Sequence, residues 1–175
     1  MLTSGSRGSA VKKLQRDLNI QLEQLDMLAH ISAPANSLFD RETLLVVKYL
    51  QSVGGLPVDG RVDERTRRFV EEGAAGLDVL SLGSEGMQVR AVQRTLIAMQ
   101  IEIVADSRFG EFTELGVKRY QQRCEVEADG IVAAETWERI VRSRSKMIPC
   151  IALLPNPYSV ARSAQSETPI LNGKL

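Results

Sequence analysis

Residues 83–96 read GSEGMQVRAVQRTL, and residues 5–18 read GSRGSAVKKLQRDL. Both stretches hold a Gly-x-x-Gly turn, then a valine three positions later, then an apolar residue followed directly by glutamine. The spacing between them is 83 − 5 = 78 residues. Self-similarity at a fixed spacing is typical of a repeated supersecondary unit. We therefore predict that the chain contains two copies of one small module.

The repeat continues beyond this stretch at a smaller spacing. The second part of the module aligns with an offset of 109 − 39 = 70 residues. The matching residues are Phe39, Thr43, Val47, Lys48, Gln51, Asp59, Gly60, Val62 and Thr66 in copy one, and Phe109, Thr113, Val117, Lys118, Gln121, Asp129, Gly130, Val132 and Thr136 in copy two. The difference, 78 − 70 = 8 residues, is an insertion in copy one. We place it around residues 30–37, where Pro34 and Asn36 are typical of a loop.

Each copy is predicted to form three helices. Apolar residues recur at steps of three and four after each Gly-x-x-Gly turn, which indicates an amphipathic first helix. These residues are Val11, Leu14, Leu18, Leu22 and Leu25 in copy one, and Val89, Val92, Leu96 and Met99 in copy two. A second helix is expected after Asp40, a good N-cap, and after Gly110 in copy two. The Asp-Gly pairs suit a tight turn before a short third helix, and helical periodicity on both sides argues against a β-hairpin.

The predicted fold class is all-α, with two tandem three-helix modules and an extended C-terminal tail. We assign residues 1–73 to the first module, 74–80 to a linker, 81–145 to the second module and 146–175 to a Pro-containing tail. The small residues of the linker favour some freedom between the modules, although its leucines could dock one module on the other. The tail contains several apolar residues, so either its own modules or protein partners are expected to bind it.

The charge balance excludes one class of partner. The chain carries 22 Lys and Arg and 22 Asp and Glu, so its formal net charge is zero. A neutral chain has no bulk attraction for nucleic acid, and we expect no nucleic-acid partner. No stretch approaches the run of about 20 apolar residues that a membrane span needs. A local group of basic residues suits the C-terminal end of a helix dipole, and it consists of Arg139, Arg142, Arg144 and Lys146.

Residues 1–8 lack the basic segment and apolar core of a secretory signal. If Met1 is the natural start, we expect synthesis in the cytoplasm and delivery in a virion or an injection machine; otherwise a leader precedes this sequence. Cys124 closes an apolar helical pattern and is expected to be a buried thiol. We expect no disulfide between Cys124 and Cys150.

In order and spacing, these motifs resemble the peptidoglycan-binding domain found beside many cell-wall enzymes. That family shows Gly-x-x-Gly-x-x-Val, Leu-Gln-x-x-Leu, Phe-Gly-x-x-Thr, Val-x-x-Phe-Gln and Asp-Gly-x-x-Gly-x-x-Thr-Trp, and residues 1–145 resemble this pattern twice. Copy one departs from it at Asp40, Leu50, Asp63 and Arg67, and copy two departs at Ala133. Copy two is therefore nearer the family, and copy one is expected to have kept the fold and lost the binding surface.

The resemblance implies non-catalytic binding to peptidoglycan, with contacts near the Asp-Gly turns and the starts of the second helices. A glycan-peptide strand offers hydroxyls, amides and carboxylates, which Arg and Gln side chains and an aromatic platform could hold. The candidate ligand-binding residues are Asp40, Arg41, Thr43, Asp59, Arg61, Arg108, Glu111, Thr113, Tyr120, Gln121, Asp129 and Trp137. Most motif residues are expected to be structural, and Trp137 is favoured as a core residue over a platform.

We expect no catalytic residues, no metal site and no cofactor. The chain has one histidine, His30, and no His-x-x-Glu-His cluster that would bind zinc. Glu111, Glu114 and Asp106 lie close in sequence, as a pair of glycosidase carboxylates would, but charged helix faces are commonly just solvated. The alternative function is a structural subunit of a larger assembly, such as a phage tail or a contractile injection machine, that uses the same fold and the tail to dock partners. The absent signal, the divergent first copy and the apolar tail favour that alternative.

Overall fold

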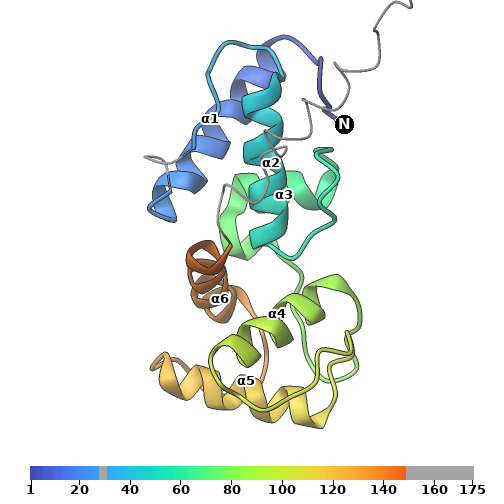
Figure 1. Ribbon diagram of the computed structural model, residues 1–175, viewed down its shortest axis with the longest axis vertical. Helices are drawn as coiled ribbons and strands as arrows, with labels where there is room; N and C mark the ends of the chain where they lie inside the picture. Colours follow the sequence, from blue (N-terminus) through green and yellow to red (C-terminus); the bar gives the residue numbers. More distant parts are fainter. Residues whose placement is uncertain (28–30, 149–175) are drawn as a thin grey trace, which may run out of the picture.

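The computed structural model describes residues 1–27 and 31–148. Within those residues the chain forms six α-helices, one short 3₁₀ helix and no strands (Figure 1). The helices are α1 (Ser9–Gln24), α2 (Arg41–Val53), α3 (Glu64–Glu72), η1 (Gly73–Gly76), α4 (Met87–Ala98), α5 (Glu111–Arg123) and α6 (Ala134–Met147). The predicted all-α fold of two three-helix modules is thereby confirmed. The expected tail lies outside the described residues from residue 149 onward.

Local sequence signals set the helix ends. The carboxylate of Asp40 caps α2 by accepting hydrogen bonds from the backbone nitrogen and the hydroxyl of Thr43, at 2.9 and 2.7 Å. Gly8 and Gly86 precede α1 and α4 with φ angles of 109° and 114°, in a region that glycine adopts at no steric cost. The predicted N-cap and the two predicted Gly-x-x-Gly turns are therefore confirmed.

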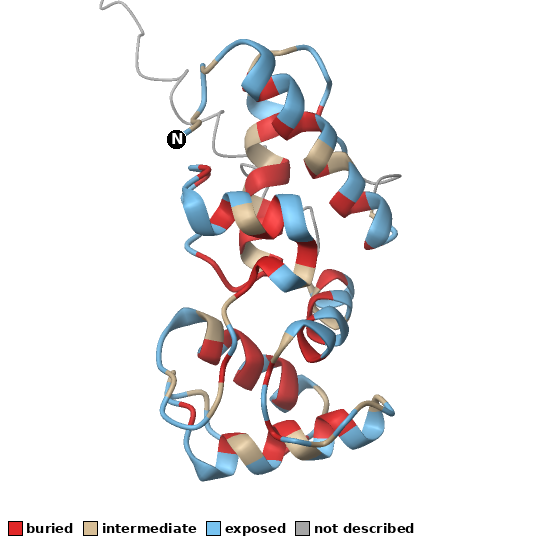
Figure 2. Ribbon diagram, turned by 180° about the vertical axis from the view of Figure 1, so that it is seen from behind, coloured by how far each residue is buried: buried red, intermediate tan, exposed pale blue. Residues whose placement is uncertain are grey.

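The apolar stripes face the interior of each module, as Figure 2 shows for the buried faces of the helices. The apolar residues of α1 and α4 with no exposed surface are Val11, Leu18, Leu22, Val89, Val92 and Leu96. In place of strands, four isolated β-bridges tie the described loops together, and they form equivalent pairs in the two copies. They join Leu2 to Val62, Arg7 to Leu38, Leu80 to Val132 and Glu85 to Arg108.

One buried glutamine closes each helix–loop–helix turn within a module, and the same arrangement occurs four times among the described residues. In the last turn, the side-chain nitrogen of Gln121 donates to Asp129 Oδ1 and to the Thr136 hydroxyl, at 2.7 and 3.0 Å. Its side-chain oxygen accepts a hydrogen bond of 2.9 Å from the backbone nitrogen of Gly130. The glutamines that close the other three turns are Gln15, Gln51 and Gln93. A buried amide whose groups are all satisfied specifies one loop conformation, because any other would leave them unpaired.

Two features differ from what the sequence predicts. Helix α1 has 16 residues and α4 has 12, so 16 − 12 = 4 of the eight inserted residues lengthen the first helix. Residues 73–76 are not a free linker, because they form η1, which packs against α3 and α6. A Cβ at Gly76 would collide with the carbonyl of Arg68 in α3, so the small residues here permit close packing rather than freedom.

The end of the second module also differs from prediction. Helix α6 continues to Met147, beyond the expected boundary at residue 145, and Arg144 and Lys146 occupy its last turn as the charge pattern predicts. Cys124 lies at the end of α5, is half-buried rather than fully buried, and forms no disulfide with a described residue. Cys150 lies outside the described residues, so its pairing remains a prediction.

Helix α6 lies between the helices of the two modules (Figure 1). It packs against α2 of the first module and α4 of the second. The Tyr49 hydroxyl donates to the carbonyl of Ser145 at 3.2 Å, and the side chain of Arg144 reaches backbone carbonyls of both modules. The two modules therefore share a hydrogen-bonded interface, which the sequence leaves open.

Candidate functional site

A groove of about 510 Å³ opens on the second module, between the loop that follows α4 and the start of α5. It is lined by Glu102, Ile103, Val104, Asp106, Arg108, Gly110, Phe112 and Thr113. Small-ligand sites are commonly clefts of about 300–1,000 Å³ with apolar walls and a few polar groups, which is the character of this groove.

The buried side chain of Gln93 holds the loop in place from below. Its nitrogen donates to Asp106 Oδ1 at 2.8 Å and to the Arg108 carbonyl at 2.9 Å. Its oxygen accepts from the backbone nitrogen of Ser107, which has a φ of 69°. A serine rarely adopts this left-handed conformation, so the glutamine fixes a backbone shape that the loop would not otherwise keep.

Asp106 lies at the rim of the groove as a carboxylate. The backbone N–H of Arg108 and the Gln93 amide donate to it, and these hydrogen bonds hold the pKa of Asp106 below its usual value. Arg108 is exposed, and its guanidinium lies 3.6 Å from the Glu85 carboxylate. Such an exposed ion pair contributes little free energy, so Arg108 is available to a ligand.

An exposed aromatic side chain forms the apolar wall. Phe112, the second residue of α5, is 81% exposed, and Val104, which also lines the groove, is 75% exposed. An aromatic face this accessible can pack against the C–H face of a sugar ring or an alkyl group, while Asp106 and Arg108 bind neighbouring polar groups. The arrangement therefore suits a ligand that carries apolar and polar groups side by side.

The structure brings two of the candidate residues, Arg108 and Thr113, to this groove. Glu111 is exposed at the first position of α5, next to Phe112. The other exposed or half-exposed candidates lie at separate turns: Asp40, Arg41, Asp59, Arg61 and Asp129. The sequence candidates therefore do not form one cluster.

Five of the candidates are buried and have structural partners within the protein. They are Thr43, Thr113, Tyr120, Gln121 and Trp137. The indole nitrogen of Trp137 donates to the Asp78 carbonyl at 2.8 Å, in keeping with its expected place in the core. Burial raises the pKa of Tyr120 to about 12, and its hydroxyl lies 3.2 Å from that of Ser143. These side chains shape the module.

Copy one has different side chains at the equivalent positions. At the offset of 70, Leu38 stands where copy two has Arg108, and Glu42 stands where it has Phe112. Both the guanidinium and the aromatic wall are therefore missing from the copy-one surface.

Phe112 is absent from the residues that the motif pattern selects. Its sequence signal is a break in helical phase: Thr113, Val117 and Tyr120 form the buried stripe of α5, and Phe112 lies off that stripe. A large apolar residue on the solvated face of an amphipathic helix is the observation that would have identified it.

Two further classes of site are absent from residues 1–27 and 31–148. No group of three or more His, Cys, Asp or Glu side chains there is placed to hold a metal ion. No helix in the same residues is both long enough and apolar enough to cross a membrane.

Comparison with known proteins identifies the module. The family model of the peptidoglycan binding domain matches the chain twice, over residues 7–70 and 85–140. No curated protein matches the chain. Among solved structures, the chain is similar to a peptidoglycan-binding protein from Clostridioides difficile in complex with glutamine hydroxamate, with 29% identity and a TM-score of 0.39. That match covers 41% of this chain and 46% of the other, which is less than half the length of either protein. Because the family model matches both repeats and covers more than half of this chain, the chain belongs to the peptidoglycan-binding domain family.

Proposed function

We propose that the chain binds peptidoglycan without cleaving it, through the groove of the second module. The observation that carries this proposal is the exposed Phe112 beside Arg108 and Asp106, in a groove of the copy nearer to the family pattern. Peptidoglycan combines sugar rings with peptide carboxylates and amides. The aromatic wall would pack on a sugar ring or an alkyl side chain, and the guanidinium would bind a carboxylate or a carbonyl.

The first module supports binding rather than contributing a second equal site. Leu38 and Glu42 replace the guanidinium and the aromatic ring there. The exposed Arg41 and Arg61 remain as polar groups that can add contacts to a long polymer. We infer that the second module supplies most of the affinity, because an exposed aromatic and an arginine are the residue types that dominate binding surfaces.

The carboxylate in the groove supports binding rather than hydrolysis. A general acid for glycoside cleavage needs a raised pKa, so that it still carries a proton at neutral pH. Asp106 has a lowered pKa, because it accepts hydrogen bonds from Arg108 and Gln93. It is thus suited to accept hydrogen bonds from ligand hydroxyls or amides.

The test is co-sedimentation of the purified chain with insoluble peptidoglycan sacculi over a range of sacculus concentrations. Wild type is expected to pellet saturably, and Phe112→Ala and Arg108→Ala are each expected to raise the apparent Kd about tenfold, as loss of a central contact does. The matched control is Val79→Ala, which removes an apolar side chain of 63% exposure that does not line the groove. Muropeptide release into the supernatant is measured in the same tubes, and soluble fragments would contradict the non-catalytic proposal.

Two results would contradict this proposal, one for the groove and one for peptidoglycan binding as a whole. Equal pelleting of Phe112→Ala and Val79→Ala would show that another surface binds the polymer. Absence of wild type from the pellet at the highest sacculus concentration would contradict peptidoglycan binding by this chain. The docking subunit of a larger assembly would then be the better hypothesis, with the segment beyond residue 148 as the first part to test against protein partners.

A further inference from the structure

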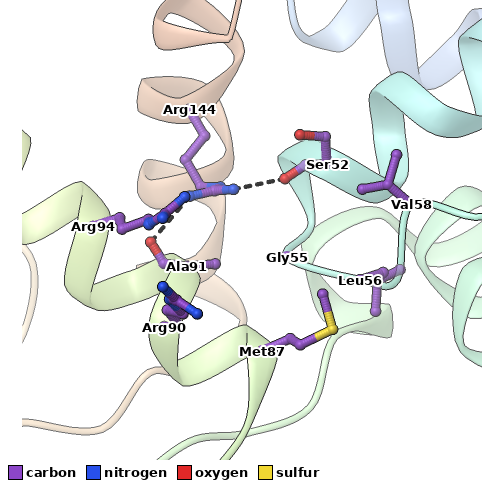
Figure 3. A pocket seen from close by; sticks show the side chains of 9 residues that line it. All are labelled: Ser52, Gly55, Leu56, Val58, Met87, Arg90, Ala91, Arg94 and Arg144. Atoms are coloured by element: carbon purple, nitrogen blue, oxygen red, sulfur yellow. Dashed lines mark hydrogen bonds between the residues drawn. The ribbon is translucent and has the colours of Figure 1, made fainter. Parts of the chain in front are cut away.

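A second cavity, of about 260 Å³, lies at the junction of the two modules (Figure 3). Three arginines contribute to its lining: Arg90 and Arg94 from α4, and Arg144 from α6. The first module supplies an apolar side that includes Leu56 and Val58. This cavity is separate from the groove beside Phe112, so a ligand bound here is independent of the proposed function.

Arg144 is fixed in the cavity wall by backbone carbonyls. Its guanidinium donates to the carbonyls of Ser52 at 2.6 Å, Val53 at 2.7 Å and Ala91 at 3.0 Å. Arginine has five N–H donors, so these three bonds leave two without a described partner. Burial, and then the neighbouring Arg94, lower the pKa of Arg144 to about 10, which still leaves it charged at neutral pH.

Arg90 and Arg94 bring two more positive charges to the same place. They lie four residues apart on α4, where like charges repel each other, and Figure 3 shows the ends of the Arg94 and Arg144 side chains close together. The ion pairs among residues 1–27 and 31–148 involve none of these three arginines. Neither guanidinium of Arg90 and Arg94 forms a hydrogen bond with a described residue. The cluster is therefore a concentration of positive charge without a protein counter-charge in that part of the chain.

The opposite side of the cavity is apolar and partly open to solvent. Val58 is 42% exposed and Met87 is 57% exposed, and both line the cavity with the buried Leu56. A purely ionic ligand would leave these side chains in contact with water. A ligand with a short apolar group next to its negative charge would cover them and pair with the arginines together.

We propose that this cavity binds the carboxylate of a small ligand that carries a short apolar group. The guanidinium forks of Arg90 and Arg94 match the planar geometry of a carboxylate. The fixed N–H donors of Arg144 line the same cavity and need no reordering when the ligand binds. The apolar group packs against Val58 and Met87, so both modules contact the ligand.

The experiment is an NMR titration of the full chain at constant ionic strength and pH 7, in which amide and arginine Nε–H shifts are followed. The probes are N-acetyl-leucine, its neutral amide N-acetyl-leucinamide, acetate and inorganic phosphate. We expect saturable shifts at the cavity residues with N-acetyl-leucine, weaker binding of acetate and phosphate, and no saturable shifts with the amide.

The variants are Arg90→Gln and Arg94→Gln, both at exposed helix positions, and each is expected to weaken N-acetyl-leucine binding about tenfold. The matched controls are Lys12→Gln and Arg16→Gln, which occupy the equivalent exposed positions of α1 in copy one and remove the same charge. They are expected to bind as wild type does.

Three outcomes would overturn the proposal. The first is the absence of saturable shifts with N-acetyl-leucine, and the second is an equal loss of binding in the copy-one controls. The third is tighter binding of inorganic phosphate than of N-acetyl-leucine, which would show that the apolar side makes no contribution. Met87→Gln tests that side directly, because it should weaken N-acetyl-leucine severalfold and leave acetate unchanged.

Discussion

Replacement of Arg144 by alanine removes the side chain that joins α6 to both modules. Two of its three acceptors, the carbonyls of Ser52 and Val53, lie at the C-terminal end of α2. The last carbonyls of a helix have no partner within that helix, so the arginine satisfies groups that α2 cannot satisfy itself. The third acceptor, the carbonyl of Ala91 in α4, also accepts from the hydroxyl of Thr95 at 3.0 Å.

The expected cost can be worked from these contacts. Hydrogen bonds with a charged partner contribute about 1.5–3 kcal/mol each. The Ala91 carbonyl keeps the Thr95 hydroxyl, and the Ser52 carbonyl keeps the backbone N–H of Gly55 at 3.3 Å, so the loss falls mainly on the Val53 carbonyl. Because the cavity is open, water replaces part of what is lost, and we expect a net decrease of about 2 kcal/mol in the free energy of unfolding. For a chain of this size that corresponds to a decrease in Tm of roughly 4–8 °C.

The assay is differential scanning calorimetry at pH 7 on wild type, Arg144→Ala, Arg144→Lys and the control Arg142→Ala. Arg142 is exposed on the same helix, and its loss removes the same charge at an expected cost within about 0.5 kcal/mol. Arg144→Lys is expected to lie between wild type and Arg144→Ala, because an ammonium lacks the planar fork that reaches three carbonyls. If Arg144→Ala melts no lower than Arg142→Ala, or if wild type already melts in two separate transitions, the arginine does not couple the modules.

Three further predictions concern stability. Gln121→Leu is expected to lower the free energy of unfolding in urea by about 3 kcal/mol, because it leaves several buried partners unpaired. Gln122→Leu, at the exposed neighbouring position, should change this free energy little. Similar urea midpoints for the two variants would contradict the role of the buried glutamines. The pKa of Tyr120 is raised to about 12 by burial, so the folded state keeps the phenol proton while the unfolded chain loses it above about pH 10. Stability should therefore fall by about 2 kcal/mol between pH 10 and 12 relative to Tyr120→Phe, and parallel pH profiles of the two proteins would refute this. Gly76→Ala is expected to lower the free energy of unfolding by about 2 kcal/mol, because the added methyl group would collide with α3. Thermal unfolding measures this against the control Ala75→Ser at an exposed site. Equal Tm values for the two variants would show that η1 can move aside.

Much of the fold is predictable because its signals are local. The Gly-x-x-Gly turns, the N-cap Asp40 and the Asp-Gly pairs each act within a few residues, through backbone conformation and short-range hydrogen bonds. The apolar stripes of α1 and α4 have helical spacing and are buried as predicted. The position of the insertion was only partly predictable, since a lengthened helix and a lengthened loop have similar local patterns until the loop packs.

The candidate groove was predictable in part. Arg108 and Thr113 follow from their place in the repeated motif, and the structure brings both to the groove. Phe112 required a comparison between the buried and solvated faces of α5, and its exposure depends on the absence of any element of residues 1–27 and 31–148 packed over it. Gln121 has an amide side chain of the kind that binds polar ligands, yet that amide forms its hydrogen bonds with residues inside the protein.

The sequence alone determined the modules, since each depends on hydrogen bonds and apolar contacts within one repeat. Only the tertiary structure decided how the modules meet. Arg144 has the appearance of a helix-end cation in the sequence, but its guanidinium contacts carbonyls at residues 52, 53 and 91, which are 53 to 92 positions away in the chain. Contacts over such separations depend on the packing angle of α6 between α2 and α4, and no local pattern encodes that angle. The arginine cluster at the junction is therefore a property of the assembled chain rather than of either repeat.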